Sequence, residues 1–174
     1  MPDRPISMVE PQIGALVADR FTLLRRIGHT AERIRAGDRL WLREPFHLPR
    51  QWGRTAPTTA IARGARPVFV TDLPPAASRS PEVHADLGIG PRRNARDLPR
   101  VAHRQHLLVT GVSRALLQRI TEDEARAEGF PTRSAWAAHW DLNLSFASSR
   151  AGCSWRDNPE IVVIEFTRIA EPLP

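Results

Sequence analysis

The chain has 174 residues and a formal net charge of +6, from 25 basic and 19 acidic side chains. All 25 basic residues are arginine and tyrosine is absent, which excludes Schiff-base chemistry, a P-loop lysine, a lysine general base and a tyrosine acid. The length suits a single domain spanning residues 1–174. The one cysteine, Cys153, cannot form an internal disulfide, and no window approaches the ~18 consecutive apolar residues of a membrane span. We therefore expect a cytoplasmic protein with no membrane partner.

The first half of the chain predicts a short helix and a strand. Residues 11–17 begin with proline and repeat apolar side chains at helical spacing, which is typical of a helix. The apolar pattern then continues to residue 27, either as helix or, after a turn, as strand. Residues 39–43 alternate with period two, so we expect a half-buried strand with Leu40 and Leu42 inward.

Further strands and a long loop are predicted in the rest of the chain. Runs rich in β-branched and apolar residues predict strands at 66–71, 106–112 and 161–169. Residues 73–100 are rich in proline and arginine and lack periodicity, which favours a mobile loop or insertion. Early strands, later helices and a closing apolar strand indicate an α+β fold with a small curved sheet or barrel.

Two consecutive helices are predicted after residue 120. Thr121 and Glu124 have the spacing of a capping box, and Gly129 supplies the stop. Thr132 can cap a second helix, on which Trp136 and Trp140 share a face because they are four residues apart. The core residues that we predict are Leu40, Leu42, Val109, Trp136, Trp140, Val162, Ile164 and Phe166.

Arginine clusters are the candidate nucleic-acid-binding sites. On the outward face of strand 39–43, Arg39, Trp41 and Arg43 alternate, which would suit a stacked base and its phosphates; alternatively, Trp41 is buried and the arginines are merely solvated. The other two clusters are Arg20 with Arg25 and Arg26, and Arg92 with Arg93, Arg96 and Arg100. Excess arginine favours a polyanionic partner, although the codon preference of a GC-rich genome would also explain it.

Two carboxylates are candidates for chemistry. Glu128 lies at the end of the first late helix, where the helix dipole opposes a negative charge, so a functional role is favoured there. Glu44 follows the basic strand and precedes Pro45. His103 and His106 have HxxH spacing, but no acidic residue is near them in the sequence, so we predict no metal site.

Several segments together resemble one family. These segments are 37–44 (GDRLWLRE), 98–100 (LPR), 109–112 (VTGV), 117–129 (LQRITEDEARAEG), 140–141 (WD), 154–159 (SWRDNP) and 163–166 (VIEF). In this order they resemble the phage and prophage branch of the ASCH domain family over most of residues 8–170, with 45–97 divergent. ASCH domains are similar to PUA domains, so the resemblance implies a small β-barrel with flanking helices and a cleft associated with RNA.

The resemblance also bears on catalysis. Some small ASCH proteins are amidohydrolases of acetylated cytidine, which use a lysine and a threonine beside a glutamate. Alignment places Phe21 at the lysine and Leu24 at the threonine, whereas Glu128 matches the glutamate, and Arg20 and Arg26 are retained. Neither phenylalanine nor leucine can transfer a proton, so we expect no efficient amidohydrolase. Phe21 would either stack on a base in the old pocket or fill it.

These observations predict a binding module for RNA or a modified nucleoside that needs no cofactor. The residues expected around one cleft are Arg20, Arg25, Arg26, Arg39, Trp41, Arg43 and Glu128, and Phe21 and Glu44 are further candidates for nucleic-acid contact. One alternative is a hydrolase of a modified nucleoside or of RNA built on Glu128 and arginines. Another alternative is a degenerate prophage domain that folds but binds no ligand.

Overall fold

A computed structural model of the protein describes residues 3–74, 81–145 and 151–169. Its main sheet has five strands in the order β1-β3-β6-β7-β2. The strands are β1 (Asp3–Ser7), β2 (Leu23–Arg26), β3 (Arg39–Arg43), β6 (His106–Leu116) and β7 (Glu160–Ile169). β1 pairs with β3 in parallel, and the other neighbours are antiparallel. The predicted α+β class is confirmed.

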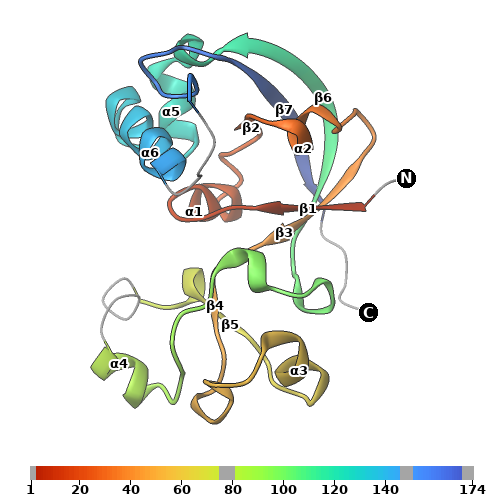
Figure 1. The fold of residues 1–174 in the computed structure, drawn as a ribbon, viewed down its shortest axis with the longest axis vertical. Helices are drawn as coiled ribbons and strands as arrows, with labels where there is room; N and C mark the ends of the chain where they lie inside the picture. The colour runs from red at the N-terminus through yellow and green to blue at the C-terminus, as the bar shows by residue number, and fades with distance from the viewer. Residues whose placement is uncertain (1–2, 75–80, 146–150, 170–174) are drawn as a thin grey trace.

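The sheet is curved but open (Figure 1). The edge strands β1 and β2 each have one partner, β3 and β7 respectively, and are not paired with each other in the described sheet. The expectation of a closed barrel is therefore corrected to an open curved sheet. A bulge between Val109 and Gly111 shifts the register of β6 against β7, and such bulges bend a strand and increase its twist.

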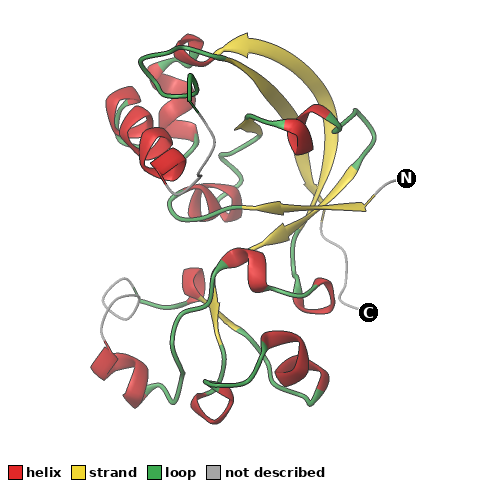
Figure 2. Cartoon of the chain, viewed as in Figure 1, coloured by secondary structure: helices red, strands yellow, loops and turns green. Residues whose placement is uncertain are grey.

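Helices gather at one end of the sheet (Figure 2). They are α1 (Gln12–Val17), α5 (Glu122–Ala127) and α6 (Arg133–Ser145), with α2 (His29–Glu32) after β2. The predicted capping box is confirmed, because Glu124 N donates to Thr121 Oγ1 and Thr121 N donates to the Glu124 carboxylate. None of the helices in the described residues is both long and apolar enough to cross a membrane.

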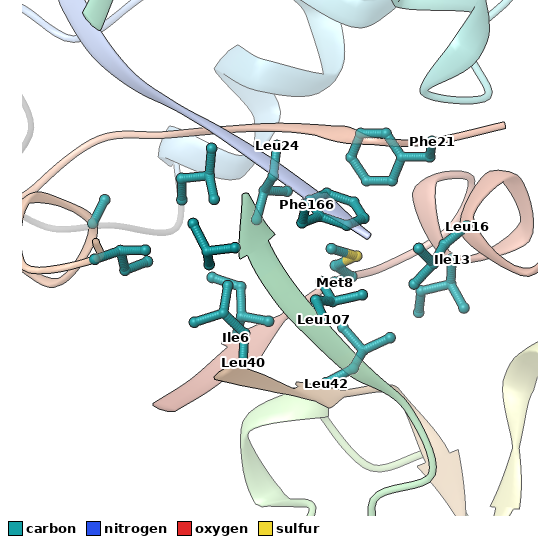
Figure 3. Close-up of a cluster of buried hydrophobic side chains, with 14 of the residues drawn as sticks. Ile6, Met8, Ile13, Leu16, Phe21, Leu24, Leu40, Leu42, Leu107 and Phe166 are labelled. Atoms are coloured by element: carbon teal, nitrogen blue, oxygen red, sulfur yellow. The ribbon is translucent and has the colours of Figure 1, made fainter. Parts of the chain in front are cut away.

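β7 has buried side chains on both of its faces. Val162, Ile164 and Phe166 belong to the main core together with Leu40 and Leu42. Figure 3 shows Phe166 with Leu40 and Leu42 in this core. Ile161 and Val163 belong instead to a second core, which holds Trp136 and Phe130. Of the predicted core residues, all are buried except Trp140, which is half-buried. β7 thus joins the sheet to the helices that cover it.

Residues 45–105, between β3 and β6, form an insertion with a core of its own. It contains the two-stranded sheet of β4 (Phe46–His47) and β5 (Val68–Phe69), helices α3 (Pro57–Ala62) and α4 (Pro81–Asp86), and several short 3-10 turns. Phe46, Leu48, Phe69 and Leu98 are buried together. In Figure 1 the insertion lies below the main sheet.

Residues 73–100, expected as a mobile loop or an insertion, fall within this insertion. Residues 75–80 of it lie outside the described residues. In the part from α4 onward, Ile89, Ala95 and Leu98 are buried, and bridges pair Phe46 with Arg93 and Pro49 with Ile89. That part is a packed portion of the insertion. Its fold depends on contacts with distant residues, which local periodicity does not report.

Candidate functional site

A cavity of about 300 Å³ lies between the end of β1, the start of α1, the end of β2 and one face of α6. We call it the aromatic pocket. Its lining includes Gln12, Arg25, Arg26, Trp136, His139 and Trp140. Because β1 and β2 are the two edges of the sheet, the pocket lies where the open sheet leaves a gap.

The face that α6 presents to this pocket combines aromatic and polar side chains. Trp136, His139, Trp140 and Asn143 all line the cavity, and their spacing of i, i+3, i+4 and i+7 places them on one helical face. The indoles of Trp136 and Trp140 are stacked, with ring centroids 5.4 Å apart and planes 19° from parallel. Thr132 caps this helix as predicted, accepting from Ala135 N at 3.1 Å.

Behind the pocket, the Glu128 carboxylate accepts hydrogen bonds on both of its oxygens. Arg25 Nη1 donates to Oε1 at 2.5 Å, while Gln12 Nε2 and Trp136 Nε1 donate to Oε2 at 2.9 and 2.6 Å. Glu128 is only 1% exposed. It therefore fixes the positions of three side chains that line the cavity, and it does not line the cavity itself.

The positive charge of Arg25 is offset by two carboxylates within the protein. Its guanidinium also donates from Nη2 to Glu124 at 2.9 Å, so it faces two carboxylates. Burial raises the pKa of the Glu128 carboxyl, while the Trp136 indole, the Arg25 charge and the Gln12 amide act in the opposite direction. The pocket wall at Arg25 thus carries no net positive charge to attract an anion.

Arg26 and His139 are the other charged or ionisable side chains in the lining. Arg26 donates from Nη2 to the Ser7 carbonyl at 2.9 Å and so links the end of β2 to the end of β1. Burial lowers the pKa of His139, and the nearby Arg26 charge lowers it further. A neutral imidazole offers one donor and one acceptor to a ligand.

The structure brings together Arg25, Arg26 and Glu128 from the predicted set, but not the strand platform. Trp41 is buried, with its ring 5.5 Å from that of His103, as the alternative expected, but its two arginines are not merely solvated. The Arg43 guanidinium stacks over the Trp41 ring at 4.7 Å, and Arg39 pairs with Asp3 at 3.3 Å. The face of β3 that carries Trp41 is therefore covered by side chains of the protein itself.

The other predicted residues also lie away from the pocket. Phe21 is 2% exposed and packs edge-to-face on Phe166, so it belongs to the main core and neither fills nor lines the pocket. Glu44 is fully buried and pairs with Arg104. Arg20 is exposed beyond the end of α1.

Most lining residues were not predicted as part of a site, among them Gln12, Trp136, His139, Trp140 and Asn143. Trp136 and Trp140 were expected in the core because they share a helical face. The available signal was the composition of that face, since histidine and asparagine at i+3 and i+7 interrupt what would otherwise be an apolar stripe.

No group of three or more metal-ligating side chains occurs in the described part of the chain. His103 and His106 hydrogen-bond to each other, Nε2 to Nε2, at 2.9 Å.

Comparison of the chain with protein-family models, with curated proteins and with solved structures gives no match. The arrangement of the site itself therefore carries the functional argument.

Proposed function

We propose that the aromatic pocket binds one unpaired base of RNA, or one modified nucleoside. The observation that carries the proposal is the stacked pair Trp136 and Trp140 in a cavity of about 300 Å³. Stacking of a base on an aromatic side chain contributes ~1–3 kcal/mol. A cavity of this volume is at the small end of ligand pockets, which span ~300–1,000 Å³, so it suits a single ring system.

The electrostatics of the lining support an uncharged ligand group. Arg25 is neutralised by Glu124 and Glu128, and burial disfavours the charged form of His139. The hydrogen-bonding edge of a base is neutral and carries both donors and acceptors, which the His139 imidazole and the Asn143 amide are equipped to meet. A phosphate would gain little at Arg25, because two carboxylates already offset that charge.

The location of the pocket supports membership in the ASCH branch of PUA-like domains, which we propose for this chain. The resemblance implies a barrel with a cleft, and the curved sheet has its one gap, between β1 and β2, beside the pocket. We propose that the fold is a PUA-like barrel left open at this point.

The hydrolase alternative is less well supported by the same geometry. A general base needs a free lone pair within reach of the attacking water. In Glu128 both oxygens accept from Arg25, Gln12 or Trp136, and the side chain is 1% exposed. We therefore assign Glu128 a positioning role in binding.

The test is a titration of tryptophan fluorescence with nucleosides, including acetylated cytidine, and with RNA trinucleotides. We expect saturable quenching by at least one of these probes. Trp140→Ala should weaken that binding about tenfold or more, because loss of ~1.4 kcal/mol or more of stacking corresponds to a tenfold change in Kd. Calorimetry reports the same Kd without depending on the indole that is removed.

Trp41→Phe is the matched control, because Trp41 is a buried tryptophan outside the pocket. It should leave every Kd unchanged. Absence of binding for all nucleosides and trinucleotides would refute the proposal, and so would equal Kd values for the wild type and Trp140→Ala.

A further inference from the structure

The net charge of the protein is confined to the insertion. Residues 45–105 contain ten arginines and four acidic residues, a net charge of +6. The remaining 15 arginines and 15 acidic residues cancel. The sheet and helices that build the aromatic pocket are therefore neutral as a whole, while the insertion carries all of the excess positive charge.

Most of these insertion arginines are exposed and are not used to hold the fold. Arg93, Arg100 and Arg104 are the exceptions, since Arg93 donates to the Gly53 and Thr55 carbonyls, Arg100 pairs with Asp3 and Arg104 pairs with Glu44. Exposed arginines with no ion pair among the described residues are Arg50, Arg54, Arg63, Arg66, Arg92 and Arg96. Free guanidinium groups of this kind bind phosphate through paired hydrogen bonds.

A chain of adjoining cavities leads from the aromatic pocket to this charged surface. A second cavity, of about 840 Å³, shares Val9 and His139 with the aromatic pocket and reaches Arg92. A third, of about 460 Å³, shares Arg92 and adds Arg50 and His84. The third cavity has no acidic residue in its lining, in contrast to the second.

From these observations we infer that the insertion is a phosphate-binding surface for single-stranded RNA, on which the strand continues after one base has entered the aromatic pocket. The inference rests on the proposed function for the identity of the polymer. The two sites then bind different parts of the RNA. The pocket binds a neutral base, and Arg92 and Arg50 bind the phosphates of the adjoining nucleotides.

The lining of the second cavity determines where the sugar-phosphate backbone of the RNA can lie. Glu10 and Asp72 line it, and the Asp72 charge is matched by Arg104 Nη1 at 2.7 Å. Phosphates are expected at Arg92, which lines both the second and the third cavity, and at Arg50 in the third. A duplex does not present an unpaired base for the pocket, so a single strand is the form of RNA that satisfies both sites.

The experiment measures binding of a fluorescein-labelled 12-nucleotide single-stranded RNA at several salt concentrations. The variant Arg50→Gln/Arg92→Gln removes two proposed phosphate contacts. Each contact to a single strand contributes about 0.7 to the slope of log Kobs against log salt. We expect the slope to decrease by about 1.4, and affinity at 0.1 M salt to fall on the order of tenfold or more.

Arg33→Gln/Arg119→Gln is the matched control. Both arginines are exposed and lie outside the insertion, and their replacement lowers the net charge by the same amount. It should change neither slope nor affinity appreciably. Equal effects of the two double variants would overturn the inference, because the interaction would then depend on total charge alone. Binding of poly-glutamate or anionic lipid vesicles as tight as that of RNA would also overturn it.

Two outcomes separate this inference from the proposed function. If nucleosides bind but the 12-nucleotide RNA binds no tighter than a trinucleotide, the insertion surface is refuted and the pocket assignment stands. If the RNA binds with the expected salt dependence but Trp140→Ala has no effect on any Kd, the pocket assignment is refuted and the insertion remains the binding surface. DNA of the same sequence shows whether the 2′-hydroxyl contributes.

Discussion

Arg25 Nη1 and Glu128 Oε1 lie 2.5 Å apart, and both side chains are almost fully buried, at 5% and 1% exposed. Such a pair stabilises a fold only if hydrogen bonds satisfy its remaining polar atoms. Here Gln12, Trp136 and Glu124 complete the network. The same network sets the wall of the aromatic pocket, so stability and ligand geometry depend on one cluster of side chains.

Arg25→Met should strongly destabilise the protein. It removes the guanidinium and leaves Glu128 buried with only neutral donors, Gln12 and Trp136. Loss of one partner from a buried ion pair costs ~3–5 kcal/mol. The free energy of unfolding from urea denaturation measures this loss.

The double variant Arg25→Met/Glu128→Leu removes both charges and should lose less stability than the two single variants combined. Arg114→Met is the surface control, because Arg114 and Glu160 are each 58% exposed in their side chains, and exposed pairs contribute ~0–1 kcal/mol. Additive losses in the double variant would show that Arg25 and Glu128 are not coupled.

Elements set by neighbouring residues were predictable from the sequence. The strand over 39–43, the capping box at Thr121 and the cap at Thr132 match the structure, because alternation and capping involve residues within a few positions of each other. Element lengths were less accurate: the strand predicted at 106–112 extends to Leu116, since its pairing with β7 continues there.

The aromatic pocket depends instead on contacts between distant residues. Glu128 lies 103 residues from Arg25 and 116 from Gln12, so no local pattern connects them. Trp41 illustrates the converse: the alternation correctly placed it opposite Leu40 and Leu42, but sequence does not report that His103 covers it. The charge imbalance between residues 45–105 and the rest was available from sequence, although only the structure defines 45–105 as one unit.

Arg104→Met should loosen the insertion from the main sheet. Arg104 donates from Nε and Nη2 to the fully buried Glu44 at 3.0 and 2.8 Å, and from Nη1 to Asp72. Without it, Glu44 is a buried charge without a charged partner, which costs ~3–5 kcal/mol. Hydrogen exchange should show faster exchange of amides in β4 and β5 than elsewhere.

The conservative variant Arg104→Lys separates charge from geometry. Lysine retains the charge but not the two parallel hydrogen bonds to Glu44, so we expect an intermediate loss of stability. Uniform acceleration of exchange over the whole chain would indicate a global loss of stability and contradict a role specific to the insertion.

Stability should fall as the pH is lowered from 7.5 to 5.5, because two histidines resist protonation in the folded state. Burial lowers the pKa of His47, opposed by its hydrogen bond to the Gly90 carbonyl and assisted by the charges of His84 and Arg92. Burial likewise lowers the pKa of His139. The unfolded chain binds these protons near pH ~6.5, so the free energy of unfolding decreases below that pH.

The raised pKa of the Glu128 carboxyl has the opposite effect on the pH dependence, because protonation of a group whose pKa is raised on folding favours the folded state. The histidine contribution is therefore read from variants. In His47→Gln/His139→Gln the decrease in unfolding free energy between pH 7.5 and 5.5 should be smaller than in the wild type. His29→Gln, at an exposed histidine on α2, is the control for replacement of a histidine that is not buried. An unchanged pH dependence in the double variant would show that neither histidine resists protonation, since removal of both groups must alter the number of protons taken up on unfolding.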